Sequence, residues 1–233
     1  MDTEHARQFW QVAQTFPPEK ETVYPTHAKA HGFDEQKGKS VLEYGCGGGS
    51  DTISLLRRGA NVFFVDIVPG NVALTRKRVD EWRRAHGSAT FPDCNPLGYV
   101  LEHSDVLPFR EFHFDTISCH GVLHHIEETL MHKVIDEQFR VLKSGGELFA
   151  MLYTEILYAK VADRIEELHK ARGWTRDRAF GHFTDGGNDK HWCIARAYTF
   201  DEGRKLFEQH GFEFVSSVEY NDRDFRTFRM RKP

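Results

Sequence analysis

Strand and helix signals alternate from residue 38 to residue 154, and this alternation restricts the possible folds more than any other feature. Helical stretches separate five short runs rich in β-branched and aromatic residues: KSVLEYG, NVFFVDI, YVLEHSD, FDTISCH and ELFAMLYT. Such a pattern is typical of a parallel sheet with helices on both faces. We therefore predict an α/β fold with a doubly wound, Rossmann-like, mostly parallel sheet of seven strands, the last two coming from EFVSSVEY and FRTFRMR.

The segments outside this core at 38–154 differ from it in character. Residues 1–37 predict an N-terminal helical cap, and 155–195 predict an insert of one helix followed by a polar loop. Residues 196–233 predict a helix and the two closing strands, so that 1–233 forms a single domain. We expect the cap and the insert to build the substrate pocket.

Charge and composition argue against several classes of function. A formal net charge of −4 does not suit a nucleic-acid surface. The arginines near the C-terminus are interleaved with acidic and aromatic residues and predict a solvated strand face: Arg223, Arg226, Arg229 and Arg231. No apolar run approaches the roughly 20 residues that span a bilayer, and MDTEHARQFWQ lacks the apolar stretch of a secretory signal. Four scattered cysteines suit a reducing compartment, so we expect a cytoplasmic protein.

A glycine-rich turn follows the first predicted strand in VLEYGCGGGSD, residues 41–51. In a doubly wound sheet this turn lies at the carboxyl edge, where ligands bind. Glycines allow positive φ angles and close approach of a ligand to the backbone, and the next helix directs its N-terminal N–H groups there. The four glycines therefore predict a ligand site: Gly45, Gly47, Gly48 and Gly49.

The spacing of these glycines discriminates between ligands. A dinucleotide fingerprint, G-x-G-x-x-G, fails because Ser50 stands at its third glycine, and the Gly-Lys-Ser/Thr of a phosphate-binding loop is missing. The pattern that fits is acidic-x-Gly-x-Gly-x-Gly: Glu43, Gly45, Gly47, Gly49. It resembles motif I of the class I S-adenosylmethionine (SAM)-dependent methyltransferases, and EHSDVLPF, FDTISCHGVLHHI and FRVLKSGGELFAMLYT resemble later segments of the family. The nearest group is that of the small-molecule, ubiquinone/menaquinone-methylase-like enzymes.

The resemblance implies which residues contact the cofactor. They are Glu43, Gly45, Cys46, Gly47, Asp66, Ile67, Asp105, Val106 and His120. Asp66 would accept hydrogen bonds from the ribose hydroxyls and Ile67 would pack on the adenine, whose amino group would meet Asp105. The backbone near His120 would hold the methionine ammonium. An acidic residue at the position of Asp66 also occurs in nicotinamide enzymes, so that Asp66 alone does not discriminate.

The acceptor side carries three candidate catalytic residues. His124 is a candidate general base or a structural residue of the VLHH stretch. Tyr153 ends the fifth strand, where it lines the acceptor pocket or packs as a core residue. Tyr24 closes over the sulfonium, a cation that aromatic faces attract, or packs within a loop. His120 and His124 also suggest a metal pair, but without a clear third ligand we expect no metal.

These observations predict an enzyme that transfers a methyl group from SAM to a small-molecule acceptor by direct in-line displacement, mainly through positioning, with S-adenosylhomocysteine as the product. Two alternatives stay open: a nicotinamide-dependent oxidoreductase, and a SAM-binding module without turnover. We expect a small molecule as the partner, no nucleic acid and no membrane span. The acceptor atom and the oligomeric state are left unassigned.

Overall fold

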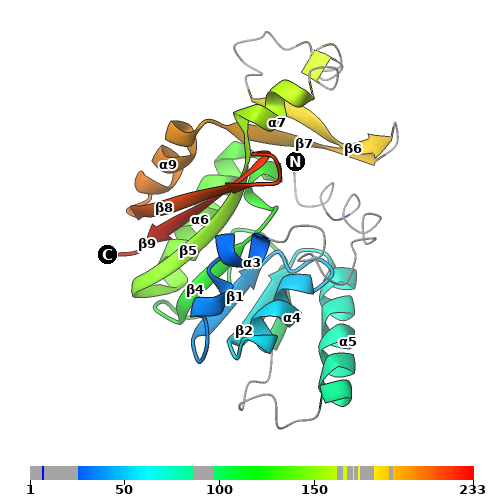
Figure 1. Ribbon diagram of the computed structural model, residues 1–233, viewed down its shortest axis with the longest axis vertical. Helices are drawn as coiled ribbons and strands as arrows, with labels where there is room; N and C mark the ends of the chain where they lie inside the picture. Colours follow the sequence, from blue (N-terminus) through cyan, green and yellow to red (C-terminus); the bar gives the residue numbers. More distant parts are fainter. Residues whose placement is uncertain are drawn as a thin grey trace.

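Five parallel strands form the centre of the sheet in the order β3-β2-β1-β4-β5. Their bounds are β1 (Ser40–Tyr44), β2 (Asn61–Asp66), β3 (Leu97–Val100), β4 (Phe114–Cys119) and β5 (Leu142–Thr154). The computed structural model describes residues 7, 26–86, 97–161, 165–166, 170, 173, 181–188 and 191–233, with backbone only for 184–188 and 191–193. The chain leaves β1 toward β2 on one side and reaches β4 on the other side (Figure 1). This reversal of strand order places a ligand crevice at the carboxyl ends of β1 and β4.

Four further strands extend the sheet beyond β5. β8 (Glu213–Tyr220) and β9 (Phe225–Arg231) pair antiparallel, and β9 also runs antiparallel to β5. β6 (His182–Asn188) and β7 (His191–Tyr198) form a second antiparallel pair, and β7 joins the end of β5 in parallel. The doubly wound, mostly parallel sheet is confirmed, but the described residues form nine strands of it where seven were predicted. The polar loop expected in the insert was wrong, because part of it forms β6 and β7.

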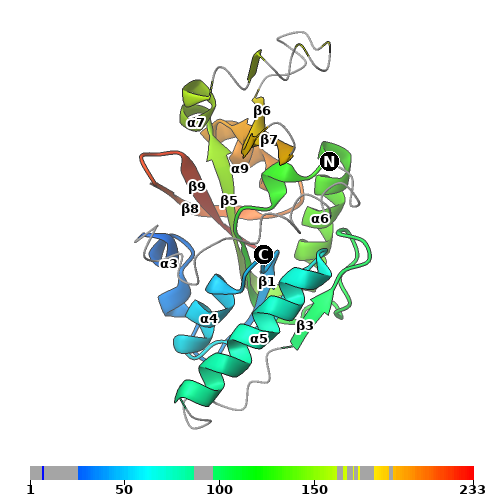
Figure 2. The ribbon, with the colours of Figure 1, turned by 90° about the vertical axis from the view of Figure 1, so that its right-hand side faces the viewer.

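Helices cover both faces of the sheet, as predicted (Figures 1 and 2). The helices are α3 (His27–Ala30), η1 (Phe33–Glu35), α4 (Ser50–Arg57), α5 (Pro69–His86), η3 (Leu123–His125), α6 (Glu128–Val141), α7 (Glu155–Lys160) and α9 (Phe200–Glu208). Neighbouring residues of β1 point to opposite faces: Val41 packs with α3, α4 and α5, whereas Leu42 packs with α6 and α9. The alternation of strands and helices thus produces two apolar cores, one on each face.

The described part of the N-terminal cap contains α3 and η1, which pack beside α4. Ala28 and Phe33 are buried in the same cluster as Leu55. At the other end of the chain α9 begins with the predicted capping box, in which Thr199 and Glu202 satisfy each other's backbone N–H groups. Among the described helices, none has the length and apolar character needed to cross a membrane.

The prediction of a solvated arginine face on the last strand was wrong for Arg226, which is only 4% exposed. Its guanidinium lies between Glu219 of β8 and Glu155 of α7. Arg229 and Arg231 instead bind Glu147 on β5, at 2.7 and 3.0 Å. Burial raises the pKa of the Glu147 carboxyl, but these two arginines outweigh burial and bring the pKa below its usual range. Carboxylates from β5, α7 and β8 therefore neutralise the positive charge of the arginines on β9.

Candidate cofactor and acceptor site

The turn after β1 is held against the end of β2. The amides of Gly45 and Cys46 both donate to the carbonyl of Val65, at 2.9 and 3.0 Å. Gly45 has φ +84°, and a Cβ there would lie 2.3 Å from Cγ2 of Val122. Gly47 has φ +50°, and a Cβ there would meet no atom of the described residues within 4 Å. Gly45 is thus needed for packing within the protein, whereas Gly47 presents bare backbone to open space.

The other two glycines of the turn face helix α5. A Cβ on Gly49 would lie 2.8 Å from Oγ1 of Thr75 and 3.1 Å from its Cα. A Cβ on Gly48 would lie 2.8 Å from the guanidinium of Arg78, which donates to the Gly48 carbonyl. The expectation that all four glycines make room for a ligand was therefore too broad, because three of them make room for protein.

Asp66 ends β2 directly beside this turn and is 7% exposed. Its Oδ2 accepts hydrogen bonds from the Gly47 amide at 2.9 Å and from Nδ2 of Asn71 at 3.1 Å, and Oδ1 accepts from the Val68 amide at 2.9 Å. Burial raises the pKa of the carboxyl, although these donors oppose the shift. The backbone of Ile67 also lowers the pKa of Asp66, so that the carboxylate is surrounded by donors from the turn, from α5 and from its own strand end.

Glu43 and Cys46 are buried parts of the same framework. Glu43, 3% exposed, accepts a hydrogen bond from Oγ1 of Thr52 in α4, which fixes the helix against β1. Sγ of Cys46 accepts from Oγ1 of Thr75 at 3.5 Å. Burial, followed by the nearby Asp66 and Glu43, raises the pKa of the Cys46 thiol well above its ordinary value. Cys46 is therefore a packing residue with a protonated thiol.

Tyr44 connects the end of β1 with the loop after β3. Its hydroxyl donates to the carbonyl of Ser104 at 2.7 Å. The pKa of Tyr44 is raised well above its ordinary value by burial, then by Cys119 and by the carboxylates of Asp66 and Asp105. The two predicted cofactor carboxylates, Asp66 and Asp105, thus lie near one tyrosine at the carboxyl edge of the sheet.

Apolar side chains at this edge keep exposed surface. Val106 is 58% exposed, and Ile67 is half-buried. Arg7, from the N-terminal segment, donates to the carbonyl of Ile67 and to that of Leu101, both at 3.0 Å. Arg7, which is far away in the sequence, therefore lies across the ends of β2 and β3. The family resemblance predicts that the adenine binds beside it.

His120 and His124, the two histidines that suggested a metal pair, have different surroundings. His120 follows β4, and its Nε2 lies 3.1 Å from the hydroxyl of Tyr220. His124 is instead 2% exposed and stacks on Tyr153 with ring centroids 3.8 Å apart. Burial, with a smaller contribution from His125, lowers the pKa of His124 well below its ordinary value, so its ring is neutral near pH 7.

Tyr153 is half-buried in an aromatic group that joins the sheet to the insert. Its ring lies 5.7 Å from that of Phe183 on β6 and 5.6 Å from that of Phe225 on β9. The third catalytic candidate, Tyr24, lies outside the described residues. The roles of these tyrosines and of His124 stay predictions.

Sequence reasoning missed three residues beside His120. His27 and His31, both fully buried, and Asp51, in the first turn of α4, surround its ring. The spacing His27-x-x-x-His31 puts two histidines on one side of a helical turn and was a readable signal. The position of Asp51 carried no signal, because its partners are far away in the sequence.

Comparison with known proteins agrees with this geometry. Residues 42–150 match the family described as a methyltransferase domain. A ubiquinone biosynthesis O-methyltransferase of Xylella fastidiosa (strain M23) is 30% identical over 122 residues, which make up 52% of this chain and 45% of that relative. The matched stretch thus spans less than half of the relative's length.

Solved structures resemble a larger part of the chain. A SAM-dependent methyltransferase from Methanosarcina mazei has a TM-score of 0.66 at 20% identity, covering 90% of this chain and 98% of that chain. The 1,6-didemethyltoxoflavin-N1-methyltransferase of Burkholderia thailandensis, solved with 1,6-didemethyltoxoflavin and S-adenosylhomocysteine, has a TM-score of 0.62 at 17% identity, covering 89% and 76%. At these identities the likeness shows the fold. Residues 42–150 are thus similar in sequence to a methyltransferase domain, and the chain shares its fold with a SAM-dependent methyltransferase of known structure.

Proposed function

We propose that the protein transfers a methyl group from SAM to a small-molecule acceptor and releases S-adenosylhomocysteine. The observation that carries this proposal is the hydrogen bond from the Gly47 amide to Asp66. It connects a stretch of partly exposed backbone to a buried carboxylate. This link lies at the carboxyl edge of β1 and β2, close to the point where the strand order reverses. The names of the Xylella and Burkholderia proteins support a small-molecule acceptor.

The positions of the side chains support the following cofactor contacts. We assign the ribose hydroxyls to Asp66. The exposed Val106 and the half-buried Ile67 offer apolar surface to the adenine, whose amino group we assign to Asp105, a carboxylate near Tyr44 at the same edge of the sheet. The bare backbone at Gly47 suits the adenosyl and methionine portion.

The remaining predicted cofactor residues have supporting roles in this assignment. Gly45 and Cys46 hold the turn in place, and Glu43 fixes α4 behind it. The backbone at His120 is assigned to the ammonium group of the cofactor. These roles belong to the proposal and depend on the same ligand as Gly47 and Asp66.

Bound SAM supplies a methyl group that its sulfonium already activates. The protein therefore needs to hold the acceptor in line with the methyl, exclude water, and accept a proton where the acceptor carries one. We assign the lining of the acceptor pocket to Tyr153, and the covering of the sulfonium to Tyr24. His124 can accept a proton, since its ring is neutral near pH 7, once the acceptor comes within hydrogen-bond distance.

The competing functions differ in ligand or in turnover. A nicotinamide-dependent oxidoreductase would bind NADH at the same edge, yet Ser50 occupies the third glycine position of that fingerprint. A SAM-binding module would share every cofactor contact and lack turnover. We further propose a cytoplasmic location and no nucleic-acid substrate, on the basis of the scattered cysteines and the net charge of −4.

A turnover screen separates these functions. The full chain is incubated with SAM and a panel of phenols, catechols, amines and thiols, and S-adenosylhomocysteine is measured by mass spectrometry. We expect acceptor-dependent formation of S-adenosylhomocysteine with at least one class, and a strong decrease in the Asp66→Ala variant. SAM binding without product in the whole panel would favour the binding module. Binding of NADH in place of SAM would overturn the proposal.

A further inference from the structure

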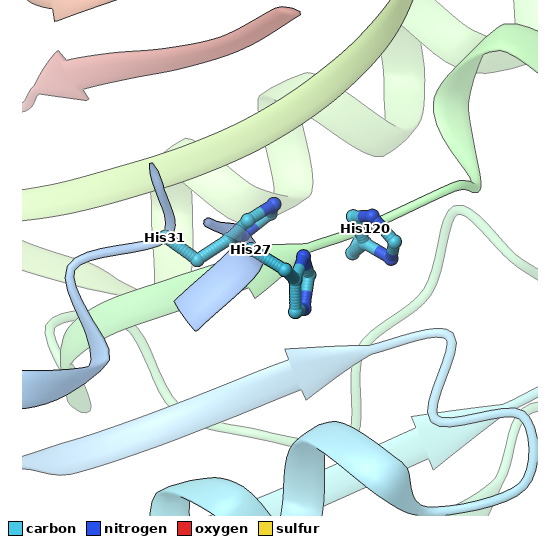
Figure 3. A group of neighbouring side chains, drawn as sticks. All are labelled: His27, His31 and His120. Carbon is cyan, nitrogen blue, oxygen red and sulfur yellow. The ribbon is translucent and has the colours of Figure 1, made fainter. Parts of the chain in front are cut away.

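Three histidines from two distant parts of the chain meet beside the carboxyl end of β4. Figure 3 shows the rings of His27 and His31, from the segment of α3, next to the ring of His120. The ring centroids lie 4.6 Å apart for His27 and His31, 4.0 Å for His27 and His120, and 5.0 Å for His31 and His120. One nitrogen from each ring lies within 4.8 Å of the other two.

A buried carboxylate supports two of these rings. Nε2 of His27 lies 2.9 Å from Oδ1 of Asp51, and Nδ1 of His120 lies 3.8 Å from Oδ2 of the same carboxylate. Asp51 is 2% exposed and belongs to the first turn of α4. Metal-binding histidines generally donate their second N–H group to a carboxylate or a carbonyl in this manner.

The contact with Asp51 determines which nitrogen of His27 keeps a lone pair. With Nε2 donating to the carboxylate, Nδ1 carries a lone pair. This Nδ1 is buried and has no hydrogen-bond partner among the residues that the structure describes. A buried acceptor without a partner costs about 1–3 kcal/mol, so an unused lone pair at this place calls for a ligand.

The other two rings are oriented by hydroxyl groups. His120 contacts the hydroxyl of Tyr220 through Nε2 at 3.1 Å. His31 lies between Ser118 and Thr227, with Nδ1 at 3.2 Å from one hydroxyl oxygen and Nε2 at 3.1 Å from the other. A hydroxyl can donate or accept, so each of these contacts can hold a ring whose other nitrogen binds a metal.

We propose that His27, His31 and His120 bind one divalent transition-metal ion such as Zn²⁺, with Asp51 orienting His27. Imidazole nitrogens suit zinc, cobalt, nickel and iron, whereas magnesium and calcium prefer oxygen. Two nitrogens on a tetrahedral zinc lie about 3.3 Å apart, so the rings must move closer together and His31 gives up one hydroxyl contact. This proposal departs from the expectation of no metal, since two of its ligands, His27 and His31, come from outside the HGVLHH stretch and His124 is not among them.

Three protein ligands leave a fourth position open, as in catalytic zinc sites. The loop that carries His120 also carries Val122, which contacts the turn at Gly45. The proposed metal site therefore shares a loop with a residue that packs on the cofactor turn, and we assign the fourth position to water. Binding of the metal itself does not depend on methyl transfer.

The test is a titration of untagged, chelator-treated full-length protein with Co²⁺ alone, followed by visible absorption, and with Zn²⁺ alone, followed by calorimetry. We expect one ion per chain. His120→Gln should weaken binding at least about a hundredfold, and Asp51→Asn should weaken it about tenfold to a hundredfold, as loss of a supporting carboxylate does. The matched control is His103→Gln, which removes an exposed histidine outside the cluster and should leave the affinity unchanged.

Two results would overturn the site: less than stoichiometric binding by the folded wild type, or equal affinity in wild type and folded His120→Gln. If the variants do not fold, anomalous scattering at the zinc edge from crystals of the zinc-loaded wild type decides. An ion among the three histidines supports the proposal, and an ion only elsewhere refutes it. Because these experiments contain no SAM, their failure leaves the proposed methyl transfer untouched, and the reverse also holds.

Discussion

The backbone amide of Gly47 donates a 2.9 Å hydrogen bond to Oδ2 of Asp66, and this bond connects the turn after β1 to the end of β2. Gly47 is the position of the turn at which an added Cβ would meet no atom of the described chain within 4 Å, and its φ angle is positive. The turn is thus held by a buried carboxylate while its outer side stays open. The proposed cofactor site depends on this combination.

Gly47→Ala should weaken binding of S-adenosylhomocysteine by about tenfold or more, equivalent to about 1.4 kcal/mol, because the new methyl group occupies ligand space. The positive φ angle adds a loss of stability of about 1–2 kcal/mol. The matched control is Gly38→Ala, since Gly38 has φ +74° and open surroundings but lies at the amino end of β1. Calorimetry and thermal melts should show similar destabilisation in both variants and weaker binding only in Gly47→Ala. Equal affinities in the two variants would contradict the assignment.

Gly45→Ala should destabilise the protein strongly, by about 2–5 kcal/mol, since positive-φ strain adds to overpacking. The clash is specific, because the new Cβ would lie 2.3 Å from Cγ2 of Val122. Adding Val122→Ala should therefore recover part of the lost stability, measured by denaturant unfolding. Additive losses in the double variant would show that Val122 is not the obstacle.

Arg226→Met should lower the free energy of unfolding by about 1–3 kcal/mol, because it removes the hydrogen bonds of a buried guanidinium to two partly exposed carboxylates. Arg226 is 4% exposed and binds both Glu219 and Glu155. Arg223 binds the same Glu219, but its side chain is 65% exposed. Arg223→Met is the matched control, and we expect no measurable change in urea unfolding. If both variants lost similar amounts of unfolding free energy, burial would not explain the importance of Arg226.

The stability of the protein should fall as the pH decreases below about 6.5, in part because of His124. Burial depresses the pKa of His124 in the folded state, so the unfolded chain binds a proton that the folded protein does not. This contribution is present above the unfolded pKa of histidine and is lost as the pH falls toward the folded value. His124→Phe keeps the stacking on Tyr153 and should reduce the slope of unfolding free energy against pH by up to about 1.4 kcal/mol per pH unit.

The control for this pH profile is His103→Gln, which changes an exposed histidine. Urea unfolding of all three proteins between pH 5 and 7.5 gives the slopes, and His103→Gln should follow the wild type. If His124→Phe also has the slope of the wild type, His124 titrates in the folded protein and is less buried than the structure indicates.

The core elements were predictable because short stretches of the sequence carry the signals for their strands and helices. Strands β1, β2, β4 and β5 come from β-branched and aromatic runs, and α9 from a capping box at Thr199. The β6–β7 pair was missed because its segment, HFTDGGNDKHW, is rich in glycine and polar residues and reads as a loop. Pairing with the end of β5, a long-range contact, determines this structure instead.

The candidate site was predictable only where one segment carries several of its residues. The turn at 43–49 and Asp66 follow a spacing that can be read directly from the sequence. The histidine group was not predictable as a whole, since 89 residues separate His31 from His120. Likewise, Arg226 looks solvent-exposed in the sequence, and only the folded chain brings Glu155 and Glu219 to it.

Calorimetric titration of the full chain with S-adenosylhomocysteine, beside NADH and the Asp66→Ala variant, tests the central claim most directly. The variant's fold is checked by circular dichroism, because Asp66 accepts hydrogen bonds from its own backbone surroundings. The account predicts binding of one S-adenosylhomocysteine per chain, a large loss of affinity in folded Asp66→Ala, and no binding of NADH. Folded, ligand-free wild type that binds NADH, or that binds neither ligand, would contradict it.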